Sequence, residues 1–192
     1  RCDRVVSMGP SAPGLPFVDM ENAEGAYAAV AHLHRTGRRR IAALHGQEGN
    51  PCAEARREGY RRAVRDLGLP DLSRIGKFRR EAGYDLTQSL LAEEPGIDAI
   101  FAATDAMASG AMQALADLGV KVPQDVAVVG FDDSVIATCT APPMSTVRQP
   151  VEQMAAAATR ALVHRQIAPH WRCVFPAELQ VRASSAGVTA AR

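Results

Sequence analysis

Three short segments of the sequence are apolar at every position: Ile41–Leu44, Ala99–Ala103 and Val126–Phe131. A strand with one solvated face would alternate apolar and polar residues, whereas a strand covered on both faces is apolar throughout. Stretches with helical periodicity separate these segments, and strands that alternate with helices are typical of right-handed βαβ units. The sequence therefore predicts an α/β fold, a doubly wound parallel sheet with helices on both faces.

Helical periodicity and end signals predict the other elements. The helices are expected over residues 22–35, 53–67, 83–93, 105–118 and 150–165, and further strands over 73–78, 145–148 and 173–181. Asn22 is a good N-cap for the first helix, and Gly37 is a good stop at its end. We expect a five-stranded lobe over residues 17–145 and a frayed tail over residues 183–192.

The composition excludes several classes of protein. The chain has 192 residues, of which 47% are hydrophobic, so it can bury a core. Its 22 Lys and Arg nearly balance its 21 Asp and Glu. This balance argues against a disordered polyelectrolyte and against a chain whose main role is to grip a phosphate backbone. Four widely spaced cysteines indicate reduced thiols, not a zinc site or a disulfide scaffold.

The ends and the apolar runs of the chain carry further expectations. No run reaches the roughly 18 consecutive apolar residues of a membrane span, so we expect no membrane partner. The first residues lack the apolar region of a signal peptide. The chain begins with Arg1 instead of Met, which indicates a processed chain or a fragment.

Carboxylates follow two of the apolar segments, at the edge of the sheet where open α/β folds bind ligands. Thr104 and Asp105 follow one segment, and Asp132 and Asp133 follow the other. Clustered carboxylates suit either Mg²⁺ or the vicinal hydroxyls of a sugar. Asp105 is also well placed to cap the helix that begins there. Asp132, directly after an apolar strand, is expected to face the ligand crevice.

Arg56 lies early in the helix expected over residues 53–67. A cation at that end opposes the helix dipole, so contact with a ligand or a carboxylate explains it better than support of the helix. The sequence has no phosphate-binding P-loop, no GxGxxG after a strand and no GxSxG elbow. An enzymatic function would therefore depend on the acidic residues alone, and we expect no cofactor.

Four longer stretches form a pattern. They are VAHLHRTGRRRIAALHG (30–46), RREGY (56–60), DAIFAATDAMASGAMQALADLGVKVPQDVAVVGFDDS (98–134) and APPMSTVRQP (141–150). The pattern closely resembles the effector-binding core of the LacI/GalR family of bacterial transcriptional regulators. The resemblance covers roughly residues 5–185, and it is most specific from Asp98 to Pro150.

The resemblance implies a periplasmic-binding-protein-like sensor with two lobes, a ligand cleft between them and three crossings of the chain. By this comparison one lobe is complete and the other is partial. Residues 1–19 would end the amino-terminal lobe and make the first crossing, and 20–145 would form the carboxyl-terminal lobe. Residues 146–178 would return to the amino-terminal lobe, and 179–192 would make the last crossing and the tail. The helix-turn-helix headpiece would be absent, so this chain alone is not expected to bind an operator.

The resemblance also implies roles for individual residues. Arg56 stands where the family has a ligand-contacting arginine, and Asp132 where it has a hydroxyl-binding aspartate. Thr104 replaces an asparagine that commonly contacts the ligand, and it offers one hydroxyl in place of an amide. Phe78 falls where an aromatic ring often stacks on a sugar.

Dimers of the family form through the helix after the strand that ends at Thr104 and through the loop after GFDD. In this sequence Met112, Leu115 and Ile136 are apolar residues in those regions. The resemblance therefore implies a homodimer, although a buried core position is the alternative for Leu115.

The function implied is an effector-sensing domain of a cytoplasmic LacI-type regulator, which binds a sugar or a similar metabolite and controls operator binding allosterically. The effector would shift the population of lobe arrangements. Two alternatives remain open. One is an exported sugar-binding protein of a transport system, and the other is a Mg²⁺-dependent enzyme that uses Asp105, Asp132 and Asp133.

Overall fold

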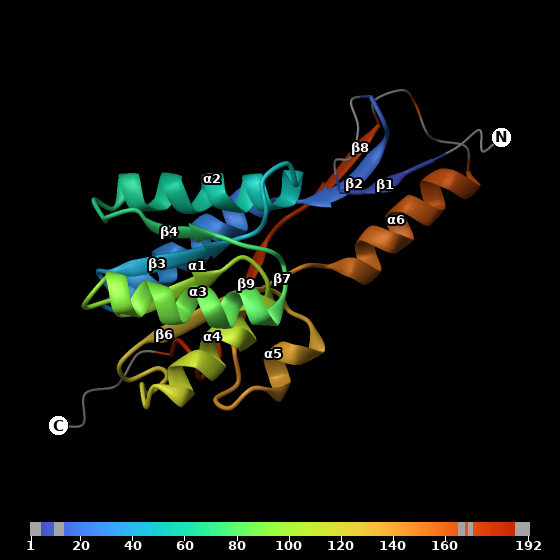
Figure 1. Cartoon of the computed structure of the whole chain (residues 1–192). Helices are drawn as coiled ribbons and strands as arrows, with labels where there is room; N and C mark the ends of the chain where they lie inside the picture. Colours follow the sequence, from blue (N-terminus) through green and yellow to red (C-terminus); the bar gives the residue numbers. More distant parts are fainter. Residues whose placement is uncertain (1–4, 10–13, 165–167, 169–170, 187–192) are drawn as a thin grey trace.

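Two β-sheets organise the chain in the computed structural model, which describes residues 5–9, 14–164, 168 and 171–186. The larger sheet has six strands in the order β4-β3-β5-β6-β7-β9, and the smaller has three in the order β1-β2-β8. Figure 1 shows the larger sheet within a layer of helices on each side, and the smaller sheet with one helix beside it. We call these two parts the larger and the smaller lobe.

The larger lobe is a doubly wound α/β unit. Its strands are β3 (Ile41–His45), β4 (Leu72–Ile75), β5 (Ala99–Ala102), β6 (Ala127–Asp132), β7 (Ser145–Arg148) and β9 (Glu178–Gln180). All neighbouring strands are parallel except β9, which is antiparallel to β7. The predicted fold class is therefore confirmed.

Helices cover both faces of this sheet. Helices α1 (Asn22–Arg35) and α2 (Pro51–Asp66) lie on one face, α3 (Arg80–Glu93) and α4 (Asp105–Asp117) lie on the other, and the short α5 (Val135–Cys139) follows β6. Because both faces are covered, β3 and β5 are buried at every position, as the apolar runs Ile41–Leu44 and Ala99–Ala102 require.

Helices α1 and α2 approach each other closely at Gly59. A Cβ atom at this position would lie 2.1 Å from the backbone oxygen of Ala23. Only glycine leaves room for that contact, so Gly59 sets the spacing between the two helices.

One buried residue of β3 is polar. His45 is fully buried, and neither of its ring nitrogens has a hydrogen-bond partner in the described part of the chain. Its ring meets the ring of Tyr60 edge-on, with the centroids 5.3 Å apart. Burial, and to a smaller extent the charge of Arg57, lower the pKa of His45 to about 4. The imidazole is therefore held neutral inside the core.

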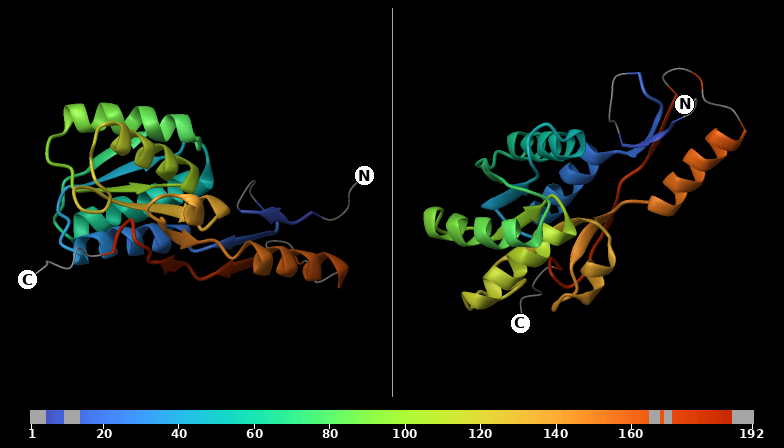
Figure 2. Two further views of the ribbon diagram at one scale, coloured as in Figure 1. Left: turned by 90° about the horizontal axis from the view of Figure 1, so that it is seen from below. Right: turned by 45° about the vertical axis from the view of Figure 1, so that its right-hand side comes forward.

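The smaller lobe contains β1 (Ser7–Met8), β2 (Phe17–Met20) and β8 (Arg172–Phe175), all parallel, and α6 (Val151–Val163). The apolar side chains of Val18 and Met154 are central to its core. The chain passes between the lobes after β2, after β7 and after β8, and Figure 2 shows these connections side by side.

The structure corrects several predicted boundaries. Strand β2 belongs to the smaller sheet, whereas β7 and β9 join the larger one, so the lobe has six strands instead of five over residues 17–145. The boundary expected after residue 145 falls inside β7. The single strand expected over residues 173–181 is two strands, because the chain changes lobes between β8 and β9. Apart from these corrections, the division of the chain into lobes given above stays a prediction.

The predicted frayed tail is wrong for residues 183–186. Ser184 and Ser185 are buried. The Ser184 hydroxyl donates to the Val128 oxygen at 2.6 Å and accepts from the Ser145 amide at 2.8 Å. The Ser185 hydroxyl lies 2.8 Å from His32 Nε2. These bonds satisfy polar groups of the larger lobe, so the segment is part of its core. Residues 187–192 lie outside the described residues.

Candidate ligand-binding site

Arg56 joins three elements of the larger lobe. Its helix begins one turn earlier, where the Asn50 side chain accepts a hydrogen bond from the Ala53 amide at 3.1 Å. The Arg56 side chain is buried, and its Nε donates to Asn22 Oδ1 at 2.9 Å. Its Nη1 donates to the Ala103 oxygen at 2.6 Å and to Asp132 Oδ1 at 3.1 Å. The structure therefore brings together the arginine and the aspartate singled out by the sequence.

Aromatic rings flank the Arg56 guanidinium. Its Cζ lies 3.7 Å from the centroid of Phe131 and 5.9 Å from that of Phe78. Phe78 lies in the loop after β4, because that strand ends at Ile75 and not at residue 78 as predicted. A Cβ atom on Gly46 would lie 2.2 Å from the Phe78 ring, so a larger residue there would displace that ring. This close approach places Phe78 beside the arginine.

Asp132 ends β6 in an unusual backbone conformation. Its φ is 117°, and that of Asp133 is 54°, values that residues with a side chain adopt rarely. The Asp132 side chain keeps 29% of its exposure, so a ligand can reach it. The pKa of Asp132 is raised to about 6, mainly by burial and also by the charge of Asp105, while the charge of Arg56 opposes the rise. The carboxyl group is thus close to half-ionised in weakly acidic solution.

Thr104, not Asp105, caps helix α4. The Thr104 hydroxyl accepts from the Met107 amide at 3.2 Å, so the predicted capping role of Asp105 is wrong. Asp105 is fully buried and accepts from the Thr146 hydroxyl at 2.6 Å and from the Ser134 amide at 2.7 Å. Thr104 follows Ala103, whose oxygen binds Arg56, but its hydroxyl is committed to the cap. Its role as a ligand contact stays a prediction.

The three carboxylates proposed for Mg²⁺ do not converge on one point, because each binds different donors of the protein. Asp105 binds hydroxyl and amide donors, Asp132 binds Arg56, and Asp133 binds two arginines. Among the described residues, no group of three or more His, Cys, Asp and Glu side chains could hold a metal ion.

Asp19, near the end of β2, and Asn22, the first residue of α1, also belong to the site and were not predicted for it. Asp19 Oδ1 accepts from Asn22 Nδ2 at 3.0 Å, and Asn22 in turn binds Arg56. Burial raises the pKa of Asp19, while its hydrogen bonds and the charge of Arg56 lower it. Asn22 does not cap helix α1, because the N-cap is Glu21 and no side-chain cap bond forms. The rule on the carboxyl ends of strands, applied to β2, would have found Asp19.

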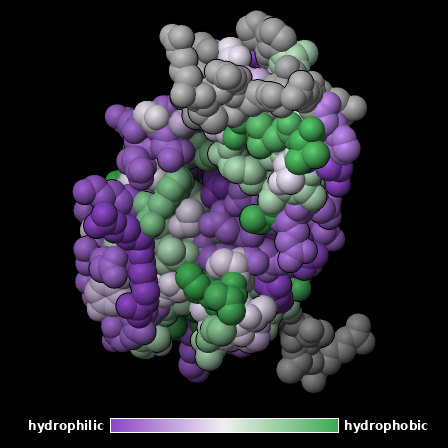
Figure 3. All heavy atoms as spheres, turned by 90° about the vertical axis from the view of Figure 1, so that its right-hand side faces the viewer, coloured by the Kyte–Doolittle hydropathy of each residue, from purple (hydrophilic) through white to green (hydrophobic). Residues whose placement is uncertain are grey.

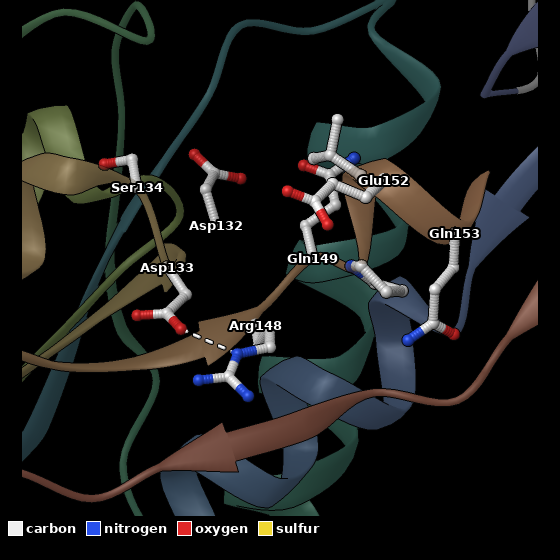
Figure 4. A pocket seen from close by; sticks show the side chains of 9 residues that line it. Asp132, Asp133, Ser134, Arg148, Gln149, Glu152 and Gln153 are labelled. Carbon is white, nitrogen blue, oxygen red and sulfur yellow. Dashed lines mark hydrogen bonds and ion pairs between the residues drawn. The ribbon is translucent and has the colours of Figure 1, made fainter. Parts of the chain in front are cut away.

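A cavity of about 440 Å³ opens beside Asp132. Its lining residues are Asp132, Asp133, Ser134, Arg148, Gln149, Pro150, Val151, Glu152 and Gln153. Figure 4 shows the aspartates on one side and the side chains of the crossing and the start of α6 on the other. Figure 3 views this side of the molecule and shows hydrophilic surface in a hollow between apolar patches. The cavity therefore lies where the chain passes between the two lobes.

The residues expected at a dimer interface occupy different environments. Leu115 is fully buried in the core of its own chain, so its assignment to an interface is corrected. Met112 is 7% exposed and lines a cavity of about 330 Å³ together with Arg80 and Thr140. Ile136 is half-buried on α5. Met112 and Ile136 remain candidates.

Residues 30–185 match the model of the family described as a periplasmic binding protein-like domain. The chain belongs to this family. Its relatives include the HTH-type transcriptional regulator CelR of Thermobifida fusca, which is 38% identical over 176 residues. That match covers 88% of this chain and 52% of the relative. The chain spans about half the length of the curated relatives that it matches.

Solved structures of LacI-type regulators share the fold of this periplasmic-binding-protein-like chain. A CelR–cellobiose complex has a TM-score of 0.84 and 37% identity, and the match covers 90% of this chain and 56% of that one. A sugar-binding LacI-family regulator from Escherichia coli, complexed with phosphate, has a TM-score of 0.84 and 30% identity, with coverages of 96% and 68%. The resemblance to the LacI/GalR family is therefore confirmed. These relatives are transcriptional regulators, not enzymes.

None of the helices in the described part of the chain is both long enough and apolar enough to span a membrane.

Proposed function

We propose that this chain is the effector-sensing part of a LacI-type transcriptional regulator and binds a sugar or a similar small metabolite. The observation that carries the proposal is the bond between Asp132, which lines an interlobe cavity, and the buried Arg56, which Asn22 and Ala103 hold in place. Membership of the periplasmic-binding-protein-like family supports the same function.

The chemistry of the site suits a neutral, hydroxylated ligand. Carboxylates such as Asp132 and Asp19 accept hydrogen bonds from vicinal hydroxyls. Two nitrogens of Arg56 already donate to protein oxygens, so the arginine serves more to hold Asp132 than to neutralise an anion. Phe78 offers an apolar ring against which a sugar can pack. The solved complex of CelR with cellobiose supports a carbohydrate as the ligand.

The proposed mechanism is a shift between two arrangements of the lobes. A ligand that contacts Asp132 from the larger lobe and the start of α6 from the smaller lobe stabilises the closed arrangement. The change would be transmitted to an operator-binding part of the protein that lies outside this chain. We further propose that the regulator acts in the cytoplasm as a homodimer, with Met112 and Ile136 at the interface.

The two alternative functions receive less support. An exported sugar-binding protein would share the fold, but the relatives reported above are transcriptional regulators. A Mg²⁺-dependent enzyme would need carboxylates that converge on one point, whereas Asp105, Asp132 and Asp133 each bind donors of the protein.

Isothermal titration calorimetry of the full chain tests the proposal. A panel of pentoses, hexoses and disaccharides that includes cellobiose is titrated into the wild type and into Asp132→Ala and Arg56→Ala. Because a hydrogen bond to a charged group contributes about 1.5–3 kcal/mol, each variant should bind roughly tenfold to a hundredfold more weakly.

A matched control comes from the exposed pair Arg61 and Asp71, whose charged atoms lie 3.8 Å apart and neither of which lines the cavity. Arg61→Ala and Asp71→Ala should bind the sugar as the wild type does. Absence of binding across the whole panel, or unchanged affinity in Asp132→Ala and Arg56→Ala, would refute the assignment.

A further inference from the structure

The loop that presents Asp132 is tied by its neighbour to two returning segments of the chain. Asp133 Oδ2 accepts from Arg148 Nε at 2.8 Å, and Asp133 Oδ1 accepts from Arg182 Nη2 at 2.6 Å. Arg148 ends β7, just before the chain enters the smaller lobe, and Arg182 follows β9, just after the chain has returned. Figure 4 shows the Asp133–Arg148 bond at the base of the cavity. We call these three residues the crossing clamp.

The aspartate side chain of the crossing clamp is largely buried, so its ion pairs with the two arginines are not surface contacts. The Asp133 side chain is only 9% exposed. Burial alone would raise the pKa of Asp133, but hydrogen bonds from Arg148 and Arg182 lower it overall. Arg182 Nη1 also donates to the Met144 oxygen at 2.9 Å, which fixes the direction of its guanidinium. Asp133 is therefore ionised and held from two sides.

The backbone next to the clamp needs such support. Asp132 and Asp133 both have positive φ, which costs free energy for residues that carry a Cβ and persists only where neighbours enforce it. The Asp133 amide donates to the Thr146 hydroxyl at 3.2 Å, and the Gln149 amide donates to the Asp132 oxygen at 3.1 Å. The side chain of Asp133 adds the charged bonds to the same two-residue loop.

We propose that Asp133, through Arg148 and Arg182, is a positioning residue that holds Asp132 in its left-handed conformation, facing Arg56 and the cavity. The clamp also joins that loop to the segments that enter and leave the smaller lobe. The orientation of Asp132 is thereby coupled to the orientation of the lobes. The inference rests on the proposed function for its purpose, but its geometry can be tested without any ligand.

The test is carried out on the full chain by NMR spectroscopy. Asp133→Asn removes the charge of the clamp and keeps the shape of the side chain. Two quantities are measured: amide hydrogen exchange at Asp133, Ser134 and Gln149, and titration of the Asp132 carboxyl carbon. The matched control is Glu24→Gln, which breaks an exposed 2.7 Å ion pair with Arg62.

In Asp133→Asn the three amides should exchange about tenfold faster or more, with the amides of β3 unchanged. The Asp132 carboxyl, free to turn toward solvent, should titrate at least about one pH unit closer to 3.8 than in the wild type, where burial raises its pKa to about 6. The control should alter neither quantity.

Three results would overturn the proposal: unchanged exchange at these amides, an Asp132 midpoint that stays or rises, or equal acceleration throughout β3, which would indicate general destabilisation. Arg148→Gln serves as the second variant, because the Arg148 side chain is 46% exposed and its loss does not endanger folding. It should change amide exchange and the Asp132 midpoint in the same directions but by smaller amounts. The absence of any change in Arg148→Gln would also overturn the proposal. Since no ligand is used, failure here leaves the effector-binding proposal standing, and failure to bind a sugar leaves the clamp standing.

Discussion

The neutral histidine in the core of the larger lobe should make the protein sensitive to mild acid. The pKa of His45 is lowered from 6.5 to about 4, mainly because burial opposes the charged imidazolium. The unfolded chain therefore takes up a proton at a higher pH than the folded chain, so stability is complete above pH 6.5 and declines as the pH falls toward 4. Linkage gives a loss of about 2 kcal/mol at pH 5 from this residue alone.

Replacement of the imidazole by a similar apolar ring should remove this loss. In His45→Phe the ring keeps its edge contact with Tyr60, and no titratable group remains in the core at this position. Urea unfolding at pH 7 and pH 5 gives the free energy of unfolding for the wild type and for the variant. The fall in stability between these pH values should be smaller in His45→Phe by about 2 kcal/mol.

A matched substitution, His34→Phe at a half-exposed position on α1, should retain the full fall in stability. The reasoning is refuted if His45→Phe loses as much stability between pH 7 and pH 5 as the wild type does. Other titrating groups contribute equally to both proteins, so the difference between their slopes isolates the histidine.

Two further predictions follow from the helix contact and from the ligand site. Gly59→Ala should destabilise the chain by about 2 kcal/mol in urea unfolding, because the alanine Cβ would lie 2.1 Å from the Ala23 oxygen. This loss should outweigh the higher helix propensity of alanine. Unchanged or increased stability would contradict the close packing of α1 and α2. Calorimetry should show a sugar affinity about tenfold weaker at pH 5 than at pH 8, because Asp132 loses its ionised, hydroxyl-accepting form below its pKa of about 6. An affinity that does not change between these pH values would show that this carboxylate does not bind the ligand.

The fold of the larger lobe could be predicted from local sequence where burial leaves little choice. Segments such as Ile41–Leu44 and Val126–Phe131 are apolar at every position, and only a strand covered on both faces needs that pattern. Which of the two sheets each remaining strand joins could not be predicted in this way. Strands β2 and β9 are short, and their partners lie far away in the sequence, so no local pattern assigns them to a sheet.

The candidate site was predictable where a residue type is unfavourable in its own helix or strand. Arg56 opposes its helix dipole, and Asp132 interrupts an apolar run, and the structure joins these two side chains. Asp19 carries no such signal, because β2 is not apolar throughout and no local pattern marks it as a strand that ends at the cleft. The place of Phe78 depends on its contact with Gly46, which only the tertiary structure reveals.

The burial of Ser184 and Ser185 against β6, β7 and α1 has a consequence for biosynthesis. Ser185 contacts His32 across a sequence separation of 153 residues, so the larger lobe closes its core with almost the last residues of the described chain. Contacts of such separation form late, because the intervening chain must first be ordered. On the ribosome, β3 to β6 emerge well before this segment. The lobe therefore completes its packing only after residue 185 has left the exit tunnel, and any truncation that removes the two serines leaves a nascent chain with an open core exposed to chaperones and proteases.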